Sequence, residues 1–307
     1  MSKRVTFTPE GEPGSILEDA FPDDDEAATP EETRRIFLER AKSGYTKVRH
    51  VFVQTPPTSA SSSRPGMLAQ LARNQRAAVL YLALLANWPW LSREHEPLPA
   101  EAWIRFLTAD GGSALTWTAQ SLSHAWGVLE KLSLIERPRK GRRIDVRPLK
   151  EDGSGDPYLP PTGSNRDLYL ILPNEFWTGQ LFATQSWPAL SVLLILLKET
   201  GGTATAPLAI DRAQAWYGIS RTTAEQGLAE LRDAKMLTSK MRQVKDPAVV
   251  GGRRRTSLHR LDGDFSLSRR DQLRAAAKNR VNPSPAELTV RKEDEDDDSE
   301  ALEAAHG

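Results

Sequence analysis

Two stretches of this chain carry the same succession of helix and hairpin signals, and this repetition constrains the fold more than any other feature. In each stretch an apolar helical segment is followed by a shorter helix, a capped amphipathic helix and two strand-like arms around a basic turn. An offset of 102 residues aligns Thr118 with Ser220 as the caps of the third helices. We therefore expect two copies of one small domain, 67–149 and 167–265.

The third helix of each copy has the clearest boundaries. Thr118 is placed to cap a helix that runs to Leu132, and Ser220 begins one that runs to Lys235. The apolar residues recur at helical spacing, which predicts one buried face on each helix. The expected buried positions are Leu122, Trp126 and Leu129 in the first copy, and Ala224, Leu228 and Leu231 in the second.

The flanking segments are interpreted as tails, linkers and helices. Thr29, Pro30 and Glu32 have the residue types of a capped helix start, and this helix is expected to end near Gly44. Stretches rich in Pro, Ser, Gly or acidic residues predict linkers and disorder. The expected division is a disordered acidic tail at 1–28, a helix and Ser/Pro-rich linker at 29–66, a first domain at 67–149, a linker at 150–166, a second domain at 167–265, a helix at 266–282 and a disordered acidic tail at 283–307.

Charge is strongly segregated along a chain that is neutral as a whole. Residues 1–32 hold 2 basic and 10 acidic side chains, and residues 287–307 hold 2 basic and 9 acidic ones. Residues 33–286 therefore hold 37 basic and 22 acidic side chains, a net charge of +15. A basic body with acidic ends predicts a polyanionic partner, and tails that compete for the same surface.

Several classes of protein are disfavoured by composition. The chain has no cysteine, which excludes disulfide scaffolds, thiolate zinc sites and cysteine nucleophiles. The longest apolar run, Ala189 to Leu197, is far shorter than the roughly 18 to 20 residues of a membrane helix. No HExxH, P-loop or nickase motif is present, so we expect no metal, no cofactor, no membrane contact and no enzymatic activity. We therefore expect a cytoplasmic protein.

The segment 218–224, with the sequence GISRTTA, resembles the turn and recognition-helix start of bacterial winged helix-turn-helix regulators of the MarR-like and GntR-like groups. Gly218 permits a positive φ at a sharp turn, Ile219 is apolar and suited to fill the space between two helices, and Ser220 is a good helix cap. The resemblance implies a mainly α fold with small β-hairpin wings, an α+β arrangement of two tandem winged-helix domains. It also implies sequence-specific binding of double-stranded DNA.

On this interpretation the third helices read bases and the hairpins hold phosphates, because a recognition helix enters the major groove by its first turns. The expected base-reading residues are Ser220, Arg221, Thr222, Thr223 and Gln226, with Gln120, Ser121 and His124 in the first copy. The expected phosphate-binding residues are Arg137, Arg139, Lys140, Arg142 and Arg143 in the first hairpin, and Lys240, Arg242, Lys245, Arg253, Arg254, Arg255 and Arg260 in the second.

Three functions remain open at this level, and the two that bind DNA imply a protein bound to a bacterial nucleoid or a plasmid. The leading one is a transcriptional regulator that binds double-stranded DNA, alone or as a homodimer. The second is a plasmid replication initiator that binds origin repeats, since such proteins are similar in having two winged helices in one chain. The third is a winged-helix protein-interaction module. The tryptophans 88, 90, 103, 117 and 126 are expected in the core rather than in a ligand pocket.

Overall fold

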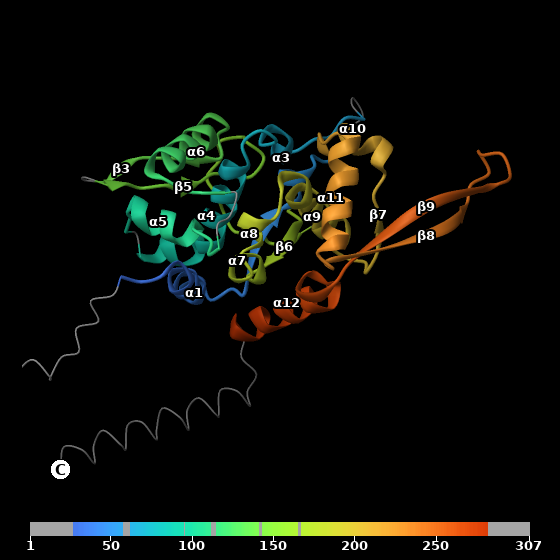
Figure 1. The fold of residues 1–307 in the computed structure, drawn as a ribbon. Helices are drawn as coiled ribbons and strands as arrows, with labels where there is room; N and C mark the ends of the chain where they lie inside the picture. The colour runs from blue at the N-terminus through green and yellow to red at the C-terminus, as the bar shows by residue number, and fades with distance from the viewer. Residues whose placement is uncertain are drawn as a thin grey trace, which may run out of the picture.

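A computed structural model describes residues 27–57, 62–94, 96–111, 115–140, 143–164 and 167–281. The predicted acidic tails fall outside these residues, except for residues 27 and 28. The described chain combines α-helices with small antiparallel sheets, in agreement with the α+β class (Figure 1).

The first half contains the segment before the predicted first domain as well as that domain. Its helices are α1 (Pro30–Ala41), α2 (His50–Val53), α3 (Met67–Gln70), α4 (Gln75–Glu94), α5 (Ala100–Leu107) and α6 (Ala119–Lys131). Its strands are β1 (Tyr45–Arg49) and the hairpin strands β2 (Ile135–Glu136), β3 (Arg139–Lys140), β4 (Arg143–Ile144) and β5 (Arg147–Pro148).

The second half has a related order of elements. Its helices are α7 (Glu175–Thr178), α8 (Leu181–Thr184), α9 (Trp187–Glu199), the 3-10 turn η1 (Ile210–Arg212), α10 (Ala213–Tyr217), α11 (Arg221–Asp233), the 3-10 turn η2 (Gly263–Phe265) and α12 (Leu267–Val281). Its strands are β6 (Tyr169–Pro173), β7 (Ala206–Pro207), β8 (Leu237–Lys245) and β9 (Arg253–Leu261).

The internal repeat is visible in the backbone around α6 and α11. Both helices have 13 residues and a side-chain cap, from Thr118 and Ser220, at the expected offset. Each is followed by a residue of positive φ, Ser133 at 53° and Lys235 at 57°, where the chain reverses into its hairpin. The common geometry shows that the two segments fold by the same local rules.

A strand pair that was not predicted joins the halves. Strand β1 lies in the segment expected to hold only a helix and a linker, and it pairs antiparallel with β6 from Tyr45 opposite Pro173 to Arg49 opposite Tyr169. Each of the two strands is followed by two short helices and one long helix. Antiparallel pairing of equivalent strands is the arrangement that a two-fold axis generates. Accordingly, the β3–β4 and β8–β9 hairpins extend from opposite ends of the molecule (Figure 1).

The core is continuous between the halves. Helices α4 and α9 are buried on nearly all sides, and one connected cluster of buried apolar side chains takes members from α1, α4, α6, α9 and α11. The expected buried positions of α6 and α11 all lie in this cluster, and so do Trp90, Trp103, Trp117 and Trp126. Trp88 is partly buried against it.

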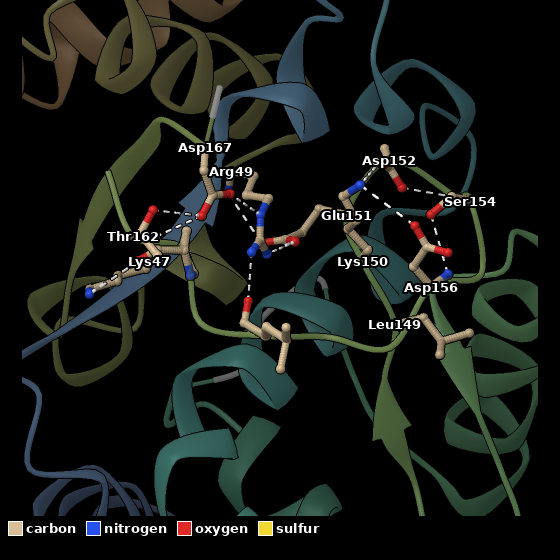
Figure 2. A network of polar contacts seen from close by, with 12 residues as sticks. Lys47, Arg49, Leu149, Lys150, Glu151, Asp152, Ser154, Asp156, Thr162 and Asp167 are labelled. Carbon is tan, nitrogen blue, oxygen red and sulfur yellow. Dashed lines mark hydrogen bonds and ion pairs between the residues drawn. The ribbon is translucent and has the colours of Figure 1, made fainter. Parts of the chain in front are cut away.

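Arg49, at the end of β1, fixes the segment 150–164 against strands β1 and β6. This segment is part of the predicted linker. Its guanidinium donates to Glu151 Oε2, Asp167 Oδ1 and the carbonyl oxygen of Leu159, each at 2.6 Å (Figure 2). Glu151 is fully buried, and this burial raises the pKa of its carboxyl although the charge of Arg49 opposes the shift. A buried ion pair with these contacts holds the segment to the body of the protein, which composition alone does not indicate.

Helix α12, expected over residues 266–282, contacts the protein body through a buried arginine. Arg270 is 1% exposed, and its guanidinium donates to the carbonyl oxygen of Leu197 at 3.2 Å and to Thr200 Oγ1 at 2.8 Å. These contacts satisfy groups at the C-terminal end of α9, where backbone carbonyls lack helical partners. Arg270 therefore serves the packing of α12 on the body.

Candidate nucleic-acid interface

The turn before α11 has the conformation that its sequence predicts. Gly218 has a φ of 69°, and Ile219 is 2% exposed between α10 and α11. The Ser220 hydroxyl accepts a hydrogen bond from the Thr223 backbone N–H at 3.0 Å and so caps α11. A Cβ atom at position 218 would overlap the side chain of Ala69, so this turn also depends on its packing against α3.

The first turns of α11 are exposed, but several of their side chains already have partners. Arg221 is 68% exposed and forms ion pairs with Asp211 at 3.1 Å and Glu225 at 2.9 Å. The hydrogen bond and charge of Glu225, with the charge of Asp211, raise the pKa of the Arg221 guanidinium. Gln226 Nε2 donates to Glu230 Oε1 at 2.8 Å. Thr222 is exposed, whereas Ser220 and Thr223 are used in the cap.

The β8–β9 hairpin is a long cationic ribbon. Its register runs over nine residue pairs, from Leu237 opposite Leu261 to Lys245 opposite Arg253. All seven of its predicted phosphate-binding residues are exposed. Arg254 lies 3.6 Å from Asp246 and Arg260 lies 2.8 Å from Asp262. Among the described residues, no carboxylate lies within ion-pair distance of Lys240, Arg242, Lys245, Arg253 or Arg255.

A hollow of about 620 Å³ joins this ribbon to the start of α11. Its lining includes Asp211 as the one acidic side chain, and Arg221, Arg242, Arg254, Arg255 and Arg212 as the basic ones. The first four arginines were predicted from the sequence, and the structure brings them to one site. Glu225 and Asp246 pair with two of these arginines, so five cations face three carboxylates in and beside the hollow. The remaining positive charge suits the hollow to an anionic partner.

Two further residues of this hollow were missed by the sequence analysis. Arg212 and Trp216 line it, with the Arg212 guanidinium 5.3 Å from the centre of the indole ring. Their spacing of four residues places them on one helical face, and this spacing was the available signal. Lys240, Lys245, Arg253 and Arg260 lie elsewhere on the hairpin, outside the residues that line the hollow.

The corresponding surface of the first half is less cationic where it is described. Gln120 and His124 are exposed on α6, while Ser121 forms a reciprocal capping box with Thr118. Arg137 forms an ion pair with Glu130, and its hydrogen bond lowers the pKa of the Glu130 carboxyl. Arg139 is exposed. Arg142 and the side chains of Lys140 and Arg143 lie outside the described residues.

The two hairpins do not lie side by side. They project in different directions from opposite ends of the molecule, so the structure gives two separate cationic elements (Figure 1). Any duplex that contacts both hairpins would have to extend along the length of the protein. The site with the best-defined geometry is therefore the hollow between α11 and the β8–β9 hairpin.

The described residues contain no group of three or more His, Asp or Glu side chains that could hold a metal ion. None of the helices in these residues has the length and apolar character needed to cross a membrane. No protein-family model, curated protein or solved structure matches this chain.

Proposed function

We propose that this protein binds double-stranded DNA in a sequence-specific manner, most simply as a transcriptional regulator. In this proposal each half is a winged helix, α11 is the main recognition helix and the β8–β9 hairpin is its wing. The observation that carries the proposal is the hollow in which Arg221 of α11 and three arginines of the hairpin converge.

The two kinds of contact divide between the helix and the hairpin. A recognition helix presents its first residues to base edges in the major groove, where an arginine can bind guanine O6 and N7 together. Arg221 and Gln226 would take this role by exchanging their contacts with Asp211, Glu225 and Glu230 for contacts with the bases. Arginines and lysines of the hairpin would lie along the phosphates and supply affinity without sequence preference.

The first half would add a second and weaker reading through Gln120 and His124 on α6. Arg137 contributes less than an unpaired arginine, because Glu130 already neutralises it. We therefore assign most of the affinity to the second half.

The test is selection of bound duplexes from a randomised pool, followed by titration of the selected duplex at several salt concentrations. If about six to eight cationic side chains contact phosphates, log K against log salt falls with a slope of about −5 to −7. An affinity that hardly responds to salt, or a pool that shows no enrichment, would contradict the proposal and favour a protein-docking module. Iterated repeats in the selected duplexes, rather than single palindromes, would indicate a replication initiator.

A further inference from the structure

A second hollow, of about 670 Å³, lies where β1, α2 and α9 meet the segments 150–152 and 167–168. It is formed by both halves, next to the Arg49 ion pair. Its lining combines apolar side chains, such as Val51 and Leu168, with four cationic ones, Arg49, Arg64, Lys150 and Lys198. Asp152 and Asp167 are the acidic residues of the lining.

Three of the four cationic side chains in the lining are paired with carboxylates, and among the described residues the fourth, Arg64, is not. Arg49 is neutralised by Glu151 and Asp167, and Lys198 lies 2.5 Å from Glu199. Lys150 lies 2.8 Å from Asp152 and 3.7 Å from Asp156. In the described part of the chain, Arg64 has no carboxylate within ion-pair distance. A hollow with an apolar wall and a guanidinium that has no carboxylate partner is suited to a small organic anion.

Gln54 gives a second indication that the hollow is built for a polar ligand. It is 7% exposed and lines the hollow, and its Oε1 accepts a hydrogen bond from Lys198 Nζ at 2.8 Å. Its Nε2 is buried and has no hydrogen-bond partner in the structure. An unpaired buried donor costs free energy, and a small rotation toward a bound anion would satisfy it.

Arg64 also connects this hollow to the candidate nucleic-acid interface. Its backbone N–H donates to the carbonyl oxygen of Ala215 at 2.7 Å, and its guanidinium lies 5.0 Å from the centre of the Trp216 ring. Trp216 in turn lines the hollow beside α11 and lies under Arg212. A ligand that draws the Arg64 guanidinium away from Trp216 therefore changes a wall of the other site.

We propose that the hollow at Arg64 binds a small organic anion with an apolar body, and that Arg64 transmits its occupancy to Trp216. Because Trp216 lines the candidate nucleic-acid interface, occupancy would also change DNA affinity. That last effect rests on the proposed function, whereas the ligand site and the change at Trp216 do not. Residues Arg64 and Lys150 would bind the anionic group, and Gln54 would donate to it.

The test uses the full chain without DNA. Phenyl phosphate and benzoate are titrated by calorimetry, with inorganic phosphate as the head group alone and benzyl alcohol as the neutral body. Saturable binding is expected for one or both aromatic anions and not for benzyl alcohol, and the R64A and K150A variants each weaken it about tenfold. R73A, which removes an exposed arginine from the neighbouring turn, is the matched control and leaves binding unchanged. Circular dichroism establishes that each variant is folded.

Intrinsic tryptophan fluorescence tests separately whether occupancy of the hollow is transmitted to Trp216. The ligand is expected to change the emission of the natural chain and to have a much smaller effect in W216F. Absence of saturable binding, or equal binding by R64A, K150A and the natural chain, overturns the ligand site. Binding with no Trp216-dependent change overturns the transmission. If the ligand binds and no duplex does, the proposed DNA function fails and the ligand site stands.

Discussion

At the scale of single residues, arginine has two opposite roles that the sequence does not separate. Arg34, Arg49 and Arg270 are buried and donate to carboxylates or backbone carbonyls, so they fix the fold. The arginines of the β8–β9 hairpin are exposed. Local sequence predicts the exposed group, because it clusters at a turn. It cannot identify the buried arginines, because their partners lie about 70 to 120 positions away in the chain.

Replacing Arg221 with alanine should reduce sequence discrimination rather than general affinity. A bidentate arginine contact to guanine contributes about 1 to 3 kcal/mol of discrimination. The measurement is the ratio of Kd values for the selected duplex and for duplexes with single base-pair changes. R232A, at the exposed end of the same helix, serves as the control. Unchanged discrimination in R221A would show that α11 does not read bases by this residue.

His50 should make stability depend on pH in a predictable direction. Burial, assisted by the charge of Lys198, lowers the pKa of this imidazole to about 4, from an ordinary value of 6.5. The unfolded chain therefore binds the proton first, and the stabilising effect of neutral His50, present above pH 6.5, is lost as the pH falls toward 4. Between pH 7 and pH 5 the loss is roughly 2 kcal/mol. Urea unfolding of the natural chain and H50Q at both pH values measures it, and an equal loss in both proteins would contradict the assignment.

At the scale of elements, the best predictions rest on local chemistry. The starts of α6 and α11 follow from their caps, and α11 ends within two residues of the expected position. The apolar helical segment that begins the first repeat, residues 67–87, belongs to two helices. Residues 71–74 form a turn, and the carbonyl of Asn74 accepts the first hydrogen bond of α4, which continues to Glu94. Helix α1 ends at Ala41, where Lys42 takes a left-handed conformation.

Strand β1 was missed because its partner strand is more than 100 residues away and the burial of its residues does not alternate.

Two glycines in related helices should respond in opposite ways to replacement by alanine. A Cβ atom at Gly227 of α11 would overlap the Pro188 carbonyl oxygen of α9, while one at Gly127 of α6 meets no atom within 4 Å. G227A should therefore destabilise the protein by about 1 to 3 kcal/mol, and G127A should stabilise it by about 0.5 to 1 kcal/mol. Thermal and urea unfolding of both variants measure the difference. A stable G227A would show that α9 and α11 are not in close contact.

At the scale of the whole molecule, the division into two copies is only part of the organisation. The two halves share one buried core, and the β1–β6 pair and the Arg49 ion pair join them. The sequence predicted the internal repeat from the order of its elements. It did not predict how the copies are joined, because that depends on long-range pairing.

A shared core predicts that the protein unfolds in one cooperative transition. Domains that are joined by a flexible linker usually unfold separately, whereas a continuous apolar core couples its parts. Scanning calorimetry should show one peak with equal calorimetric and van't Hoff enthalpies. Two resolved peaks, only one of which shifts when one half is destabilised, would contradict the coupling of the two halves.

The central claim is that α11 and the β8–β9 hairpin form a DNA-binding site, and the salt dependence of duplex binding tests it most directly. Binding of the selected duplex is measured from low to physiological salt for the natural chain and for the triple variant R253A/R254A/R255A. Each lost phosphate contact removes about 0.9 from the slope of log K against log salt, so the variant should lose up to about 3. A triple variant with the same slope and affinity as the natural chain would contradict the claim.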